Sequence, residues 1–141
     1  MVHTTDTLFY HALDELKRGD CIQSSSKFWF SARRAVRDIA RANELPDSSY
    51  YHSKRIILAI CWKQRSIKCY KFYNFAWLLH INSYNDSMSP EEISDYRKDI
   101  ARLLELLEDV KLTKQDIQNT PSEAKVVAAL HYDIKKDSGE P

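Results

Sequence analysis

The residues best suited to bind a small anion are His52 and Arg55, which lie one helical turn apart. Tyr50 and Tyr51 precede them, so phenolic hydroxyls and basic side chains gather near the expected start of a helix. Free N–H groups at a helix start attract phosphate or carboxylate, and arginine binds such groups with parallel hydrogen bonds. His52 and Arg55 are therefore the best candidate for an anion site in this sequence. The alternative, which we favour, is an ordinary helix start, where basic and aromatic residues are common.

A second candidate site lies on one side of the next helix toward the N-terminus. Four residues share that side because they recur at spacings of four, three and four: Phe30, Arg34, Arg37 and Arg41. Lys27 lies close to the same side. A phenylalanine among arginines suits a protein interface with an aromatic anchor, or stacking on single-stranded nucleic acid whose phosphates the arginines contact. We favour the interface, and two alternatives stay open: nucleic acid, or a core position for Phe30.

The segment IKCYKFYNFAWLLHINSY carries apolar or aromatic side chains on nearly every side of the helix that it predicts. Such a helix is either central in a bundle or covered by another subunit. Trp77 and Tyr84 are therefore candidate interface residues. His80 lies between them as a candidate base or ligand in a pocket. The alternative reading, which we favour, is a hydrogen-bonded core histidine.

Other chemistries find little support. The chain has no H-E-x-x-H motif, and its two glycines, Gly19 and Gly139, are too few for a Walker A loop or a G-x-G-x-x-G turn. The adjacent Glu91 and Glu92 suit a first helical turn, where carboxylates complement the helix dipole. We therefore predict no catalytic residue, no metal site and no cofactor.

The composition predicts a single helical domain. The chain has 141 residues, 43% hydrophobic and 29% charged, which suffices for one core. The scarcity of glycine argues against the many tight turns of a strand-rich fold. No apolar stretch of about 18 residues exists to span a membrane, and the N-terminus does not resemble a signal peptide. Three cysteines without a C-x-x-C pair indicate reduced thiols, so we expect a cytoplasmic protein.

The formal net charge of +1 hides an uneven distribution. Residues 1–71 contain 13 Lys and Arg against 7 Asp and Glu, whereas residues 72–141 contain 8 against 13. The basic half suits an anionic partner or the acidic half of a second copy. The alternative is ordinary solvated surface.

Hydrophobic spacing predicts an all-α, up-and-down bundle of five or six helices. We expect one domain over residues 1–132 and a loosely held tail over residues 133–141. The helices are expected over residues 5–18, 20–42, 49–64, 66–84, 90–110 and 121–132.

Local signals predict where these helices begin and end. Gly19 should end the first helix, and Asp20 with Gln23 should cap the second. The sequences SPEE and TPSE, which begin at Ser89 and Thr120, each combine a capping residue, a proline and a glutamate. Both are therefore predicted helix starts.

Two longer segments carry a family resemblance. One is ELKRGDCIQSSSKFWFSARRAVRDIA, with its Gly-Asp turn, Gln23, Lys27 and Trp29. The other is AWLLHINSYNDSMSPEEISDYRKDIARLLELLE, with a Leu-His pair, an acidic turn and a long helix. In this order and spacing, over roughly residues 12–108, they resemble the PaREP family (first type) of archaeal helical proteins. The resemblance implies a helical bundle related to HEPN domains and to the substrate-binding helical domains of nucleotidyltransferases.

Relatives of the HEPN type include metal-independent ribonucleases, whose motif is an arginine and a histidine with four to six residues between them. No histidine of this chain has an arginine at that distance. We therefore expect a non-enzymatic helical interaction module that forms a homodimer. A nucleotidyltransferase-like or nucleic-acid-processing protein would be a suitable partner. The alternative is a HEPN-type ribonuclease or nucleotide-binding protein with a degenerate site around His52, Arg55 or His80.

Overall fold

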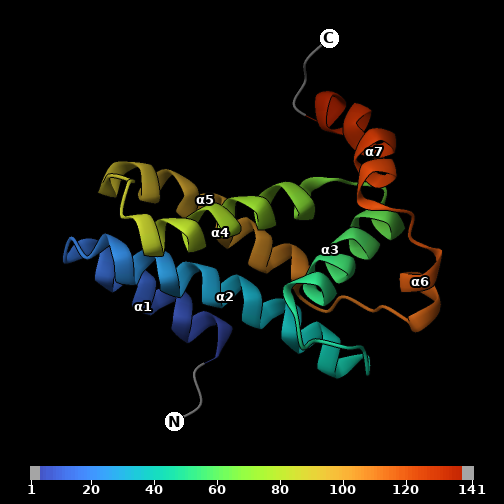
Figure 1. The fold of residues 1–141 in the computed structure, drawn as a ribbon, viewed down its shortest axis with the longest axis horizontal. Helices are drawn as coiled ribbons and strands as arrows, with labels where there is room; N and C mark the ends of the chain where they lie inside the picture. Colours follow the sequence, from blue (N-terminus) through green and yellow to red (C-terminus); the bar gives the residue numbers. More distant parts are fainter. Residues whose placement is uncertain (1–3, 138–141) are drawn as a thin grey trace. The chain divides into compact units, whose positions relative to one another are not determined.

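The computed structural model describes residues 4–137, which form seven α-helices and no strand (Figure 1). None of these helices is long and apolar enough to cross a membrane. The predicted all-α fold is confirmed, with seven helices in the described part of the chain where five or six were expected. The helices are α1 (Thr5–Lys17), α2 (Cys21–Ala42), α3 (Tyr50–Gln64), α4 (Lys68–Asn85), α5 (Pro90–Leu107), α6 (Lys114–Asn119) and α7 (Glu123–Asp137).

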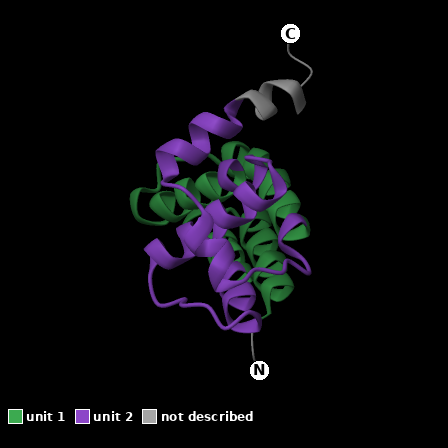
Figure 2. Cartoon of the chain, turned by 90° about the vertical axis from the view of Figure 1, so that its right-hand side faces the viewer, with its two compact units in different colours: residues 1–35, 72–105 green, residues 36–71, 106–141 purple. Residues whose placement is uncertain are grey.

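The chain divides into two compact units (Figure 2). Unit 1 comprises residues 1–35 and 72–105, and unit 2 comprises residues 36–71 and 106–141. Three helices, α2, α4 and α5, run from one unit into the other. Unit 1 therefore contains α1, the first part of α2 and most of α4 and α5, whereas α3, α6 and α7 belong to unit 2.

Most helix starts follow the predicted local signals. Asp20 accepts a hydrogen bond from the backbone N–H of Gln23 at 3.0 Å and so caps α2. Ser89 and Glu92 form the predicted capping box of α5, in which each side chain accepts the other residue's backbone N–H at 3.2 Å. Gly19 follows α1 with a φ of +81°, a left-handed conformation that glycine adopts without steric cost.

The prediction that Thr120 begins the last helix is wrong. Thr120 instead ends α6, and its Oγ1 donates a hydrogen bond to the carbonyl of Asp116 at 2.7 Å. Helix α7 begins two residues after Pro121, at Glu123, and the hydroxyl of Ser122 accepts a backbone N–H of its first turn at 3.4 Å. Thr120 and Ser122 flank Pro121, and either hydroxyl could cap a helix; Thr120 is occupied at the end of α6, so Ser122 serves α7.

Two helix ends also differ from the prediction. Helix α5 ends at Leu107 rather than near Val110, and Asp109 adopts a left-handed backbone with a φ of +56°. Helix α7 extends to Asp137, so much of the segment predicted as a tail is helical, and residues 138–141 lie outside the described residues.

The core of unit 1 includes one side of α2. Trp29 is 5% exposed and Phe28 is fully buried, and the ring of Phe28 meets Phe9 of α1 edge to face with centroids 5.3 Å apart. Ile22, at the beginning of the same side, is exposed. Helix α5 contributes three fully buried residues: Ile93, Ile100 and Leu103.

Unit 2 is built around α3. Six consecutive residues, Ile56–Cys61, are buried. Because successive residues of a helix point in different directions, this part of α3 is enclosed on every side. Within the described part of the chain, α6 buries no residue, and α7 buries Val126 and Leu130 completely.

Candidate functional site

Aromatic rings from α2 and α4 gather around His80 in unit 1. The imidazole stacks on Trp29, with ring centroids 5.0 Å apart and 29° between the planes. The ring centroid of Trp77 lies 5.1 Å from that of His80, and the ring of Tyr84 meets the His80 ring edge-on with centroids 5.2 Å apart. Tyr73 also contacts Trp29, at 5.4 Å. The structure thus brings the three candidates on α4 into one cluster, which we call the His80 cluster: Trp29, Tyr73, Trp77, His80 and Tyr84.

The His80 ring favours its neutral form in this cluster. Burial lowers the pKa of His80 below its ordinary value of 6.5, because the imidazolium loses hydration among aromatic side chains. The backbone carbonyl of His80 accepts a hydrogen bond from the hydroxyl of Ser83, one turn later in the same helix. A neutral imidazole among aromatic rings is suited to packing against an apolar or aromatic surface rather than to binding an anion.

The His80 cluster continues into an exposed apolar side of α4. Leu78 is 39% exposed, Ile81 is 38% exposed and Tyr84 is 77% exposed. No residue from Phe72 to Asn85 carries a charge. Contiguous apolar side chains at the surface, without charges among them, are typical of protein interaction sites.

Asn82 fixes α4 against α2 next to this cluster. Its side chain is almost fully buried, at 1% exposure, and its Nδ2 donates a hydrogen bond to the hydroxyl of Ser25 at 2.8 Å. Its Oδ1 accepts the backbone N–H groups of Ser87 and Met88, each at 2.8 Å. One amide therefore holds both the helix pair that carries Trp29 and His80 and the turn that leads into α5.

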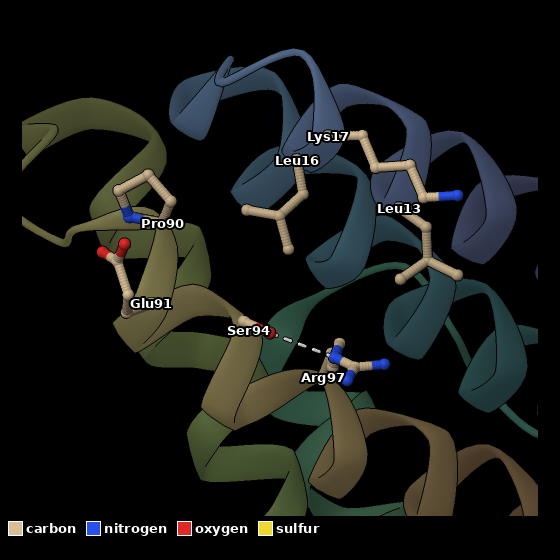
Figure 3. Close-up of a pocket in the computed structure, with 7 residues that line it drawn as sticks. All are labelled: Leu13, Leu16, Lys17, Pro90, Glu91, Ser94 and Arg97. Atoms are coloured by element: carbon tan, nitrogen blue, oxygen red, sulfur yellow. Dashed lines mark hydrogen bonds between the residues drawn. The ribbon is translucent and has the colours of Figure 1, made fainter.

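An open groove of about 450 Å³ lies between α1 and α5 in unit 1 (Figure 3). Leu13 and Leu16 of α1 form its apolar part, and Arg97 lies opposite them with its Nε bonded to the hydroxyl of Ser94 at 3.1 Å. The carboxylate of Glu91 points away from Arg97. Pro90 and Lys17 complete the lining. The groove offers an apolar wall with charges of both signs, and no predicted site residue lines it.

Three basic side chains of α2 lie against carboxylates. In unit 1, Lys27 Nζ lies 2.8 Å from Glu15 Oε1. Phe30, on the same side of the helix, is 50% exposed and therefore points outward. Arg34 is half-buried. In unit 2, the carboxylate of Asp47 lies 3.8 Å from Arg37 Nε and 3.3 Å from Arg41 Nε. These carboxylates offset part of the positive charge that the sequence places along α2.

The structure gives His52 and Arg55 separate surroundings in unit 2. The Nδ1 of His52 lies 3.3 Å from the hydroxyl of Ser48, and its backbone N–H is capped by Ser49 Oγ at 3.2 Å. Arg55 directs its guanidinium at backbone carbonyls that follow α6, with the Nη1 donating to Pro121 at 2.8 Å. The predicted pair is therefore not gathered around a common anion pocket in this structure.

The described cysteines and acidic residues can be placed individually. Cys21, Cys61 and Cys69 are thiols without a disulfide. Burial raises the pKa of the Cys61 thiol to about 11, so the nucleophilic thiolate is scarce at neutral pH. Among the described side chains, no three His, Cys, Asp or Glu residues are grouped as metal ligands.

Sequence reasoning did not identify several residues that shape the His80 cluster. The sequence could not show that Leu78 and Ile81 are exposed, because apolar residues occur on every side of α4. Asn82 was not distinguishable in the sequence from Asn74 and Asn85 of the same helix. Buried amides need partners, but only the structure shows that Asn82 is a buried one.

Comparison with known proteins assigns the chain to a family. Residues 2–104 match the model of the archaeal PaREP1/PaREP8 family, which is well over half of the 141 residues. The match includes α1 to α4 and most of α5, and therefore the whole His80 cluster. No curated protein and no solved structure matches the chain. The chain belongs to the archaeal PaREP1/PaREP8 family.

Proposed function

We propose that this protein is a non-enzymatic interaction module that pairs with a second copy of itself through the exposed side of α4. The observation that carries the proposal is the uncharged, partly exposed row of Leu78, Ile81 and Tyr84 beside the His80 cluster. In a two-fold symmetric contact, each residue near the axis meets its own copy, so like charges would repel there. The uncharged segment 72–85 meets that requirement.

The residue types on this side of α4 are those that dominate protein interfaces. Tyrosine and tryptophan are enriched among interface residues that contribute most binding energy. In the cluster, Tyr84 is exposed and Trp77 is half-buried. Ile22 extends the apolar surface, because the bond between Ser25 and Asn82 places the first turns of α2 beside the end of α4. A stable dimer needs roughly 800 Å² from each partner, so more of unit 1 than α4 alone would take part.

The wider setting is also part of the proposal. The family resemblance supports a HEPN-like bundle, and a nucleotidyltransferase-like or nucleic-acid-processing protein as partner of the dimer. Free thiols at all three cysteines support a location in the cytoplasm. Anion binding by Lys27, Arg34, Arg37 and Arg41 stays a prediction.

The test is the mass of the purified chain in solution over a range of concentrations. The expected result is a species of twice the 16.5 kDa chain mass, and its reduction to the single-chain mass by Ile81→Lys. The new lysine would face its own copy across the two-fold axis. The matched control is Tyr51→Lys, which introduces the same charge at an exposed aromatic position of α3 and should leave the dimer intact. A wild-type chain that stays single at all concentrations, or an Ile81→Lys dimer, would overturn the proposal.

The same measurement with a short single-stranded RNA tests the alternative use of α2. Phosphate contacts by Arg34 and Arg37 predict a complex that weakens as the salt concentration rises. Intact RNA in that complex would add a nucleic-acid partner to the dimer. If the wild-type chain shortens the RNA and His52→Ala does not, the protein is a nuclease, and the non-enzymatic proposal is refuted.

A further inference from the structure

The open groove between α1 and α5 is large enough to hold a small molecule (Figure 3). Its volume of about 450 Å³ lies within the range of roughly 300–1,000 Å³ that is usual for ligand pockets. All of its lining residues belong to unit 1. The wall on α1 is mainly apolar and the wall on α5 is mainly polar, and this contrast restricts the class of ligand.

The apolar wall is formed by Leu13 and Leu16, which lie on the same side of α1 because they are three residues apart. Their neighbour Ala12 is fully buried, whereas both leucines are only half-buried. Pro90, at the start of α5, adds the apolar surface of its ring. The groove therefore keeps aliphatic surface in contact with water, and a ligand that covers this surface gains hydrophobic free energy.

The polar wall holds an oriented guanidinium, that of Arg97. Ser94 lies one turn earlier on the same side of α5, and its hydroxyl accepts a hydrogen bond from Arg97 Nε at 3.1 Å. Among the described residues this is the only polar contact of Arg97, so its Nη1 and Nη2 stay available as donors. Two donors on one guanidinium can bind both oxygens of a carboxylate, and such charge-assisted pairs are strong for hydrogen bonds.

The charges of the lining suit a ligand with a single negative charge. Lys17 of α1 is a second cation, and it has no ion pair within the described part of the chain. Glu91 is the one carboxylate in the lining, and it points away from Arg97. The lining thus has a net charge of +1, which a carboxylate neutralises. A doubly charged phosphate would exceed this charge and would be repelled more strongly by Glu91.

We propose that the groove binds a small carboxylate with an aliphatic chain. The carboxylate group pairs with Arg97, and the chain lies along Leu13 and Leu16. The proposal goes beyond the dimer and does not rest on it, because no residue of α4 lines the groove. It gives the chain a small-molecule ligand in addition to a protein partner.

Titration of the full chain with octanoate, followed by amide NMR signals, tests the proposal. Below its micelle concentration, octanoate should shift the signals of residues 13–17 and 90–97 to saturation and leave those of α3 unchanged. Acetate has the charge without the chain, and octanamide has the chain without the charge, so each should bind about tenfold more weakly or worse. Shifts confined to residues 78–84 would place octanoate on the exposed side of α4 and overturn the proposal.

Variants of the polar wall separate this site from general attraction to the protein. Arg97→Gln should weaken octanoate binding about tenfold, because a charge-assisted pair is lost. The matched control is Arg102→Gln, which removes the same charge from an exposed position of α5 outside the groove and should leave binding unchanged. Ile81→Lys should bind octanoate like the wild-type chain, whether or not the protein is a dimer. Equal binding by the two arginine variants, or equal binding of octanoate and octanamide, would overturn the proposal.

Discussion

Replacing Asn82 by alanine should strongly destabilise the protein. The substitution removes the partner of three polar groups: the buried hydroxyl of Ser25 and the backbone N–H groups of Ser87 and Met88. A buried polar group without a partner costs about 1–3 kcal/mol. Water can reach Ser87, which is exposed, so we expect a total loss of about 3–4 kcal/mol rather than the sum of three full penalties. The whole free energy of unfolding of a typical domain is only about 5–15 kcal/mol.

The measurement is urea unfolding followed by circular dichroism. The matched control is Asn85→Ala, one turn later on α4, where the asparagine is exposed and its loss should change the free energy of unfolding by less than about 0.5 kcal/mol. Asn82→Asp should fall between the two, since its carboxylate still accepts the backbone N–H groups but carries a buried charge at a helix C-terminus. If Asn82→Ala and Asn85→Ala unfold at the same urea concentration, this account of the α2–α4 contact is refuted.

Three other perturbations probe the titrating groups and the helix starts. Burial alone would raise the pKa of Glu123, but the hydrogen bonds and charge of its partners hold it below the ordinary 4.5. Its contribution is therefore complete above pH 4.5 and is lost as the pH falls through the lowered pKa, so between these two pH values Glu123→Gln should lose less of its free energy of unfolding than the wild-type chain in urea unfolding, and equal losses would contradict this. The pKa of His80 is also lowered, so the unfolded chain takes up the proton first, and the free energy of unfolding should fall as the pH drops below 6.5. Urea unfolding of wild type and His80→Phe at two pH values checks this, and an unchanged pH dependence in the variant would contradict it. Ser89→Ala removes half of a capping box and should cost about 1 kcal/mol in the same assay, whereas no loss would mean that α5 is held without its cap.

The positions of the helices follow largely from local sequence. The capping box at Ser89 and the cap at Asp20 work between residues three apart, so their effect does not depend on the rest of the fold. The phase of α2 was also predictable, with Trp29 inward and Phe30 outward. The short α6 was missed because it has no apolar periodicity, although Thr113 and Asp116 form a local capping box at its start. Arg55 and Lys63 of α3 also bind it.

The candidate site, too, was predictable from the sequence only in part. The amino-acid sequence by itself determined that this protein is all-α, where most of its helices begin, and that α4 is an uncharged aromatic helix. Only the tertiary structure decided that Trp77, His80 and Tyr84 join Trp29 in one cluster, and that Arg55 binds the backbone carbonyls at the end of α6. The physical reason is the range of the interactions: caps and periodicity act within about one helical turn. Ring stacking and side-chain hydrogen bonds join residues that are distant in the chain, and these exist only once the helices have packed.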